Sequence, residues 1–314
     1  MPSCNRPRLV VVTVTEVRHV TRAEEVRRLV EDAFRSAHLQ GFVHARNLDT
    51  GSSWGYREDV VCATASVGKI PILVALMQAV GAGEMTLDER IHVGDGPRTG
   101  GPTGLSVLPD AVDLSLRAVA QLMIAISDNH ATDIILDRVG PDRVTAAMQT
   151  LGLPSIQLSG MIRDLYARAQ RRYEGADDAA VGELLRTDPD LQPQTAAWRT
   201  TPSDMTRLLQ LIWAGHAAPP PLCAVMRTML ATCATTNGLV SGFPATLQPR
   251  IAHKTGTLTG IRNDAGVIDD GDGHRCAVAV FTLSDVAHWK PQNNEANEAL
   301  GRAAALAVDY CWER

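Results

Sequence analysis

The chain has 314 residues, of which 45% are hydrophobic and 21% charged. This content is enough for the core of one large domain or of two interleaved subdomains. The formal net charge is −5 and no basic run occurs, which argues against nucleic acid or an anionic membrane surface as a partner. No stretch reaches the roughly 20 apolar residues of a membrane-spanning helix, so we expect a globular protein without a membrane partner.

Cysteine and histidine spacing gives no metal or cofactor signature. The six cysteines lack CxxC or metal-ligand spacing, and the nine histidines lack an HExxH pair, so we expect no metal and no cofactor. Scattered cysteines are typical of reduced cytosolic thiols. The apolar run at residues 9–14 is too short for an export signal and lacks a small-residue cleavage site. We therefore expect a cytoplasmic protein, with residues 1–20 as an N-terminal extension.

The first elements along the chain are a helix and a hairpin. An amphipathic helix is expected over residues 21–38, with Thr21 as its N-cap and Glu24 as the capping-box partner. Residues 42–48 predict a strand, and residues 49–51 predict a turn into a second strand. The hairpin delivers the chain to the first functional motif.

A buried helix is expected over residues 66–80, which are hydrophobic on most faces. Ser66 and Lys69 then lie three residues apart on one face of its first turn, with neighbouring side chains. Lysine is rare in this chain, since Lys69, Lys254 and Lys290 are the only three. Unlike arginine, lysine can lose its proton, so a lysine beside a serine points to proton transfer.

Helices are expected in the middle of the chain and strands at its end. The expected helices span residues 115–127, 131–138, 142–151 and 202–214, followed by strands at 250–254, 265–268 and 275–283 and a closing helix at 294–310. This order predicts an α/β fold of the α+β sandwich type. An antiparallel sheet is built from both termini with flanking helices, and an all-helical subdomain is inserted. We expect one catalytic domain over residues 21–314, with the α/β part at about 21–65 and 215–314 and the helical part at about 66–214.

Three short motifs carry the functional signal: SxxK at residues 66–69, SDN at 127–129 and KTG at 254–256. Each is weak alone, because serine, aspartate and asparagine also cap helices and lysine is also a surface charge. In this order the chain resembles the serine β-lactamase and penicillin-binding-protein superfamily, most closely the class A β-lactamase-like serine hydrolases. The resemblance runs from about residue 21 and also includes residues 100–105, 200–205 and 263–266.

The resemblance implies an acyl-enzyme mechanism. Ser66 would be the nucleophile, and Lys69 would take its proton if the amine is neutral or hydrogen-bonded to a carboxylate. Lys254 would lower the pKa of Lys69 by its nearby charge and would also dock a substrate carboxylate. Ser127 would relay a proton to the leaving nitrogen.

The remaining motif residues would hold the substrate. Asn129 would hydrogen-bond a substrate amide, Thr255 would help to hold the carboxylate, and Gly256 would let the substrate lie against the strand edge. The backbone amides of Ser66 and Thr257 would form the oxyanion hole, in which each donor contributes about 3 kcal/mol.

The residue that would activate a hydrolytic water is not evident. In class A β-lactamases a glutamate in a short loop between SDN and KTG is expected to do this. Here the loop is longer and lacks a clear Glu-x-x-Leu-Asn. There are two candidates. Asp188 lies in the segment 188–192, which weakly resembles that pattern, and Asp164 is the alternative. The acidic residues between positions 158 and 199 are Asp164, Glu174, Asp177, Asp178, Glu183, Asp188 and Asp190, and most are expected to be solvated loop charges.

Three functions stay open. The first is a monomeric serine acyl-hydrolase whose small-molecule substrate is a β-lactam or a related cyclic amide or ester carrying a carboxylate. The second is a cytoplasmic biosynthetic hydrolase or acyltransferase with slow deacylation. Leu73 and Ala120 favour it, because they stand where some exported class A enzymes place a disulfide. The third is a non-catalytic ligand-binding or sensor homologue, against which the intact motif residues argue.

Overall fold

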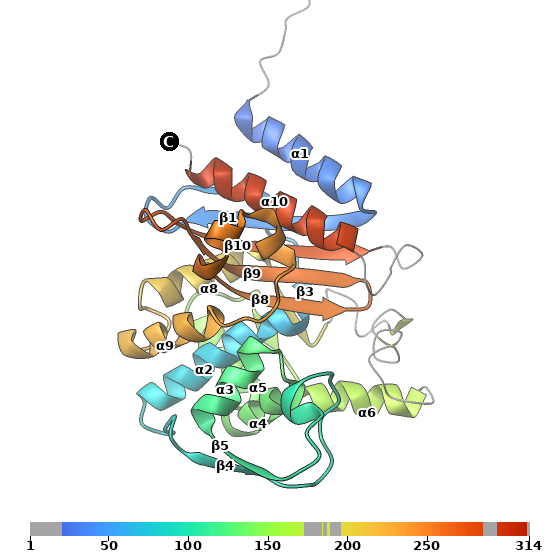
Figure 1. The fold of residues 1–314 in the computed structure, drawn as a ribbon, viewed down its shortest axis with the longest axis vertical. Coiled ribbons are helices and arrows are strands. Elements are labelled where there is room, and N and C mark those ends of the chain that lie inside the picture. The colour runs from blue at the N-terminus through green and yellow to red at the C-terminus, as the bar shows by residue number, and fades with distance from the viewer. Residues whose placement is uncertain (1–20, 173–183, 185–186, 189–195, 285–293, 313–314) are drawn as a thin grey trace, which may run out of the picture.

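The computed structural model describes residues 21–172, 184, 187–188, 196–284 and 294–312. Its centre is a five-stranded antiparallel sheet in the order β2-β1-β10-β9-β8 (Figure 1). The strands are β1 (Leu39–Asn47), β2 (Ser53–Tyr56), β8 (Ile251–Leu258), β9 (Ile261–Asp269) and β10 (Arg275–Ser284). Because β1 pairs with β10, the first strand and the last strand lie side by side, which confirms a sheet assembled from both termini.

Two helices cover one face of this sheet, α1 (Arg22–Ser36) and α10 (Asn294–Trp312) (Figure 1). The expected capping box is present: the Thr21 side chain accepts from the backbone of Glu24, and the Glu24 carboxylate accepts from the backbone of Thr21. Apolar side chains of both helices pack with the sheet in one core cluster, because each helix presents an apolar stripe to an apolar sheet face.

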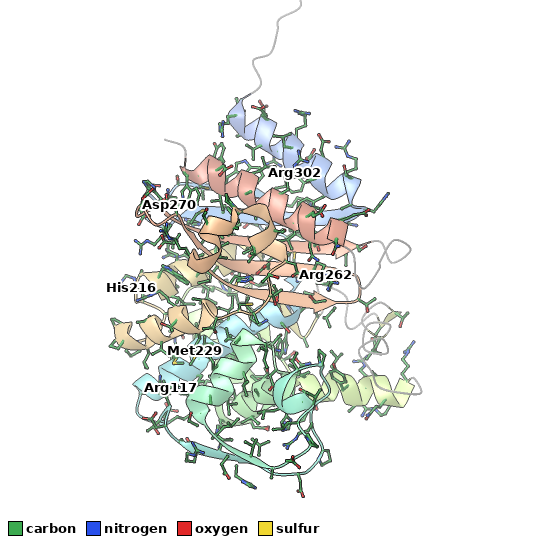
Figure 2. All side chains as sticks on the ribbon, in the orientation of Figure 1. Arg117, His216, Met229, Arg262, Asp270 and Arg302 are labelled. Atoms are coloured by element: carbon green, nitrogen blue, oxygen red, sulfur yellow. The ribbon has the colours of Figure 1, made fainter. Side chains whose placement is uncertain are left out.

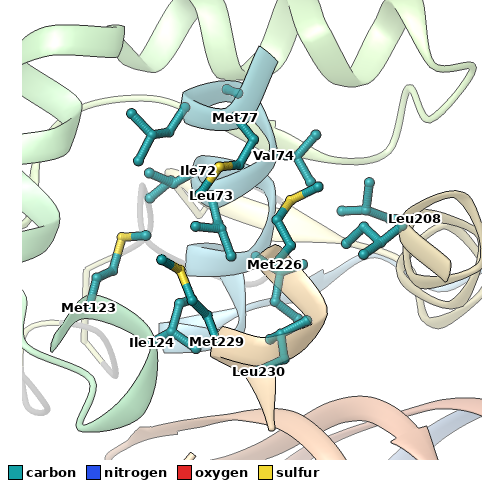
Figure 3. Close-up of a cluster of buried hydrophobic side chains, with 14 of the residues drawn as sticks. Ile72, Leu73, Val74, Met77, Met123, Ile124, Leu208, Met226, Met229 and Leu230 are labelled. Carbon is teal, nitrogen blue, oxygen red and sulfur yellow. The ribbon is translucent and has the colours of Figure 1, made fainter. Parts of the chain in front are cut away.

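The other face carries the helix α8 (Pro202–Trp213), which packs on β1 and β10. Beyond it lies the central helix α2 (Lys69–Gly81), which is surrounded by α3 (Leu116–Ala125), α4 (Asn129–Val139), α5 (Pro141–Thr150) and α9 (Pro220–Leu230). Figure 3 shows side chains of α2, α3, α8 and α9 meeting in this core. The expectation that α2 is buried on most faces is confirmed, since ten of its 13 residues are buried.

The helix expected from residue 66 is divided in the structure. Residues 65–68 form the 3₁₀ helix η1 (Ala65–Gly68), and the α-helix begins only at Lys69. A 3₁₀ turn is common at the beginning of an α-helix, where the first amide groups have no intrahelical partner. Ser66 therefore lies on a tight turn that leads into α2.

Two described helices were not expected, α6 (Ile162–Arg172) and α9. The apolar residues of α6 recur at helical spacing, at positions 162, 165, 166 and 169, so this helix did leave a pattern in the sequence. The run of three prolines at residues 219–221 obscured the beginning of α9. Proline is tolerated in the first turn of a helix, where its missing N–H costs no hydrogen bond. The expected division into an α/β part and a helical part, with a boundary at about residues 214–215, stays a prediction.

Short elements complete the described chain. They are β3 (Cys62–Ala63), β4 (Arg90–Val93), β5 (Val112–Ser115), β6 (Gln157–Leu158) and β7 (Trp198–Thr200), with the 3₁₀ turns η2 (Gly104–Ser106), η4 (Gly238–Gly242) and η5 (Ala245–Arg250). β3, β7 and β6 form a small sheet that leads into η1. Within the described ranges, no helix is both long enough and apolar enough to cross a membrane.

Candidate active site

Ser66 lies in η1, directly before α2, and lines a pocket of about 670 Å³. The residue before it, Ala65, has a φ of 47°. This left-handed conformation is unusual for a residue with a side chain, and such strain concentrates at functional sites. The turn thus holds the Ser66 hydroxyl at the pocket wall.

Strand β8 lies at the edge of the main sheet and packs directly against η1. A Cβ at Gly256 would come within 2.6 Å of the Thr64 carbonyl oxygen and 3.1 Å of the Ser66 nitrogen. The Asn263 amide on β9 reinforces this contact by donating to the carbonyl oxygen of Ala63 at 2.8 Å. Gly256 is therefore required for the approach of the strand to the serine backbone. That it also lets a substrate lie against the strand edge stays a prediction.

Lys69 is fully buried, and its amine contacts the SDN motif. Nζ donates to the carbonyl oxygen of Ser127 at 2.7 Å, to Asn129 Oδ1 at 2.8 Å and to Ser127 Oγ at 3.1 Å. Burial, and next the charge of Lys254, hold the pKa of Lys69 well below its ordinary value, although Asp128 and Asp133 oppose this. This shift is in the direction that a neutral Lys69 amine requires, and the choice between a neutral amine and a carboxylate hydrogen bond stays a prediction.

The SDN motif lies between α3 and α4 and is held rigidly. Ser127 has a φ of 60°, a second left-handed residue with a side chain in the site. The buried Asp128 carboxylate accepts from the backbone of Leu105 and, at 3.0 Å, from that of Ala131. The Asn129 amide donates to the Gly100 carbonyl oxygen at 3.0 Å. These contacts fix the loop at residues 100–105, which belongs to the resemblance, to the SDN motif.

Lys254 on β8 is almost completely buried, and its Nζ donates to the carbonyl oxygen of Thr255 at 2.9 Å. Burial lowers its pKa below the ordinary value, while the negative charges of Cys233 and Asp264 oppose that shift. The Thr255 hydroxyl is 3.2 Å from that of Thr235. Two hydroxyl groups and a lysine therefore form one polar end of the site.

The pocket joins the predicted residues to an apolar wall. Ser66, Ser127, Asn129, Thr255 and Thr257 all line it. The wall is contributed by α6 with the residue before it, and by the first residue of β7 with the two residues before that strand. Its members are Met161, Ile162, Leu165, Tyr166, Ala196, Ala197 and Trp198. Such a cavity, mainly apolar with a few convergent polar groups, is typical of a small-molecule site.

The two candidate bases do not line the pocket. Asp164 is exposed, and its Oδ2 accepts from the Met161 nitrogen at 3.1 Å at the beginning of α6. Asp188 is buried and forms an ion pair with Arg168. The acidic residues 174, 177, 178, 183 and 190 lie outside the described residues. Among the residues that the structure describes, no carboxylate lines the pocket, and the assignment of a base stays a prediction.

Several lining residues were not singled out from the sequence. Thr235 follows α9, Tyr166 lies on α6, and Arg262 lies on β9 just after the turn from β8 (Figure 2). Arg262 stands directly before the residues 263–266 that belonged to the resemblance, which was the signal available for it. Thr235 and Tyr166 stand in no motif.

The cysteines of the described chain form no disulfide. All five, Cys62, Cys223, Cys233, Cys276 and Cys311, are free thiols. Leu73 and Ala120 are both fully buried in the core, so apolar packing takes the place of any bridge there.

A serine and two buried lysines beside an antiparallel sheet with an inserted helical region are the arrangement of the β-lactamase and penicillin-binding class of proteins. The family model described as "Beta-lactamase enzyme family" matches residues 21–311. The chain belongs to this family.

The relatives carry more than one description. A "Beta-lactamase regulatory protein BlaB" of Streptomyces cacaoi is 28% identical over 285 residues, which cover 84% of this chain and 91% of that protein. The structure of a β-lactamase from Sphaerobacter thermophilus has 26% identity and a TM-score of 0.73, with 90% and 96% of the two chains covered. A leucine-to-glutamate mutant of PBP-A, an acyl-enzyme complex with penicillin G, has 25% identity and a TM-score of 0.71, with 92% and 96% covered.

Proposed function

We propose that this protein is acylated on Ser66 by a β-lactam, or by a related cyclic amide or ester with a carboxylate, and that it releases the acyl group slowly. The observation that carries the proposal is the buried amine of Lys69 between Ser127 and Asn129. A neutral amine has two hydrogens and one lone pair. The hydrogens match the Ser127 carbonyl oxygen and Asn129 Oδ1. In this form the contact of 3.1 Å with the Ser127 hydroxyl is one in which the hydroxyl donates to the lone pair.

This arrangement supports a complete acylation step. Lys69 takes the proton of Ser66, whose oxygen attacks the carbonyl carbon of the substrate. The oxyanion is stabilised by the backbone amides of Ser66 and Thr257. The proton then passes through the Ser127 hydroxyl, 3.1 Å from Lys69 Nζ, to the leaving nitrogen.

The two ends of the pocket indicate the substrate class. Thr255 and Arg262 line the pocket and supply a hydroxyl and a cationic group for a carboxylate. Lys254, the residue before Thr255 on β8, is almost completely buried and adds a second cationic group close by. Leu165 and Trp198 supply apolar surface for an acyl side chain. The free edge of β8 is available to pair with a substrate amide.

Slow release follows from the lining of the pocket. A hydrolytic water needs a general base, and no described lining residue is a carboxylate. The leucine-to-glutamate mutant of PBP-A, which has a similar fold, is an acyl-enzyme complex with penicillin G, and this supports the acylation part of the proposal. The regulatory relative favours a second candidate function, a β-lactam sensor in which the acylated state is the signal.

The test is a time course of intact-protein mass with benzylpenicillin and with a chromogenic cephalosporin, comparing wild type and Ser66→Ala. We expect a stoichiometric adduct that persists for many minutes and is absent from the variant. Rapid turnover without an adduct would make the protein a hydrolase with a base outside the described residues. Absence of both adduct and turnover would reject β-lactams as substrates.

A further inference from the structure

A second cluster of titratable side chains lies beside Lys254 and plays no part in the proposed acylation. It consists of Cys233, which follows α9, His253 on β8 and Asp264 on β9. His253 Nδ1 lies 3.0 Å from both carboxylate oxygens of Asp264. His253 is also hydrogen-bonded to the Cys233 thiol. A nucleophile, a base and a group that orients the base therefore stand in contact.

The histidine and aspartate are built into the sheet. Asp264 is fully buried, and its Oδ2 accepts from the Leu239 nitrogen at 2.9 Å. A Cβ at Gly266, the strand partner of His253, would come within 2.5 Å of the histidine Cβ. The imidazole thus has a prepared space and a fixed orientation, which a chance surface contact would lack.

The charges of this cluster favour a thiolate. Burial opposes ionisation of His253, but the charge and hydrogen bond of Asp264 raise its pKa to about 10. Burial also opposes ionisation of Cys233, and for a thiol this raises the pKa. The His253 hydrogen bond, the charges of His253 and Lys254 and the Thr235 amide together bring it down to about 7. Near neutral pH, a large share of Cys233 is paired as thiolate with the imidazolium.

Exposure separates Cys233 from the other thiols. Of the five described cysteines, Cys233 is partly exposed and the other four are buried. Burial raises the pKa of Cys62 to about 12, which makes it an internal example of an inert thiol. Both the thiolate fraction and the access of the reagent control the reactivity of a cysteine.

We propose that Cys233 is a modification site at which a small hydroperoxide oxidises the thiol to a sulfenic acid, and that this weakens the adjacent carboxylate-binding end of the pocket. The thiolate sulfur attacks one peroxide oxygen, so the S–O bond forms as the O–O bond breaks. The sulfur loses two electrons and the peroxide is reduced. His253 gives its proton to the departing hydroxide, which leaves as water, and is reprotonated from solvent. A small thiol reverses the change through a disulfide.

Two contacts connect this site to the pocket. The Thr235 amide hydrogen-bonds the Cys233 sulfur, and the Thr235 hydroxyl lies 3.2 Å from that of Thr255. An added oxygen on the sulfur disturbs this link. Oxidation also removes a negative charge that helps Lys254 to keep its proton. Both effects reduce the affinity for a carboxylate, and this second half of the inference rests on the proposed function.

The first experiment measures the pH dependence of the reactivity of the Cys233 thiol in the absence of any β-lactam. Wild type and His253→Gln are alkylated with iodoacetamide between pH 5 and 10, and the modified cysteines are located by peptide mass spectrometry. We expect Cys233 to react with a midpoint near pH 7, Cys62 to stay unmodified, and the midpoint to rise in the variant. A midpoint of 8.5 or above in wild type, or preferential reaction elsewhere, would overturn the site.

The second experiment tests whether oxidation of Cys233 changes the acylation of Ser66 in the pocket. Hydrogen peroxide is applied to wild type and Cys233→Ser, the sulfenic acid is trapped with dimedone in one aliquot, and acylation by a fluorescent penicillin is timed in another. We expect acylation of wild type to fall several-fold and to recover with dithiothreitol, with the variant unaffected. Oxidised Cys233 with an unchanged acylation rate would overturn the coupling. If the untreated protein is not acylated at all, the proposed function fails, while the alkylation and dimedone results still decide the modification site.

Discussion

The two sides of the pocket are built from opposite chemistry. On one side, Lys69, Ser127 and Lys254 are held by short hydrogen bonds and deep burial. On the other, α6 presents Ile162, Leu165 and other apolar groups. In the proposed function the polar side carries out acylation. No described residue adds a carboxylate to the apolar side, and the proposed slow release of the acyl group depends on this difference.

Replacing the buried amine is expected to have the largest effect. Lys69→Met keeps the volume of the side chain but removes the base, so acylation by a fluorescent penicillin should fall by roughly 10³-fold or more. Thermal unfolding should still show one cooperative transition, because the amine is favoured in its neutral form and no charge is left unpaired. A folded variant with acylation within tenfold of wild type would remove Lys69 from the role of base.

A carboxylate added to the apolar side should supply the general base that the described lining of the pocket lacks. Ile162 lines the pocket at the beginning of α6, where its nitrogen donates to Asp133 Oδ1 at 2.9 Å, so its backbone is fixed. Ile162→Glu is expected to speed loss of the penicilloyl adduct by about 10²-fold, the usual gain from a positioned general base. Ile162→Gln is the matched control without a base. Equal release in both variants would mean that altered packing, not base catalysis, frees the acyl group.

The charge of Lys254 should determine the pH range in which Ser66 is acylated. Its charge lowers the pKa of Lys69, and only neutral Lys69 can take the serine proton. The rate of acylation at a saturating concentration of fluorescent penicillin should therefore rise as the pH increases through the lowered pKa of Lys69. In Lys254→Met that pKa rises, so the rise should move to higher pH. Thr255→Ala should weaken binding without moving the profile, and a profile unmoved by Lys254→Met would contradict the coupling.

These residues also mark how far the sequence could predict the molecule. The order of SxxK, SDN and KTG predicted the family and five groups that line the pocket. The expected strands at both ends of the chain, around a helical middle, predicted the sheet from both termini. The position of α6 could not be predicted. It depends on long-range contacts, in which Asp133 accepts from the backbone of Ile162 and Arg163, and Arg163 pairs with Asp137. Likewise, His253 and Asp264 come together through the pairing of β8 with β9, and Cys233 joins them through the packing of α9 against β8.

The smallest expected effect tests what the apolar side does for acylation itself. Leu165→Ala removes apolar contact from the pocket wall, which should cost about 1 kcal/mol of binding, or roughly fivefold in affinity, for a penicillin with an aromatic side chain. For 6-aminopenicillanic acid, which lacks that side chain, the same substitution should change acylation by less than about twofold. Comparing the second-order acylation constants of the two compounds measures this selectivity. An equal loss for both would mean that Leu165 supports the Ser66 side of the pocket through packing, so that the two sides act as one structural unit.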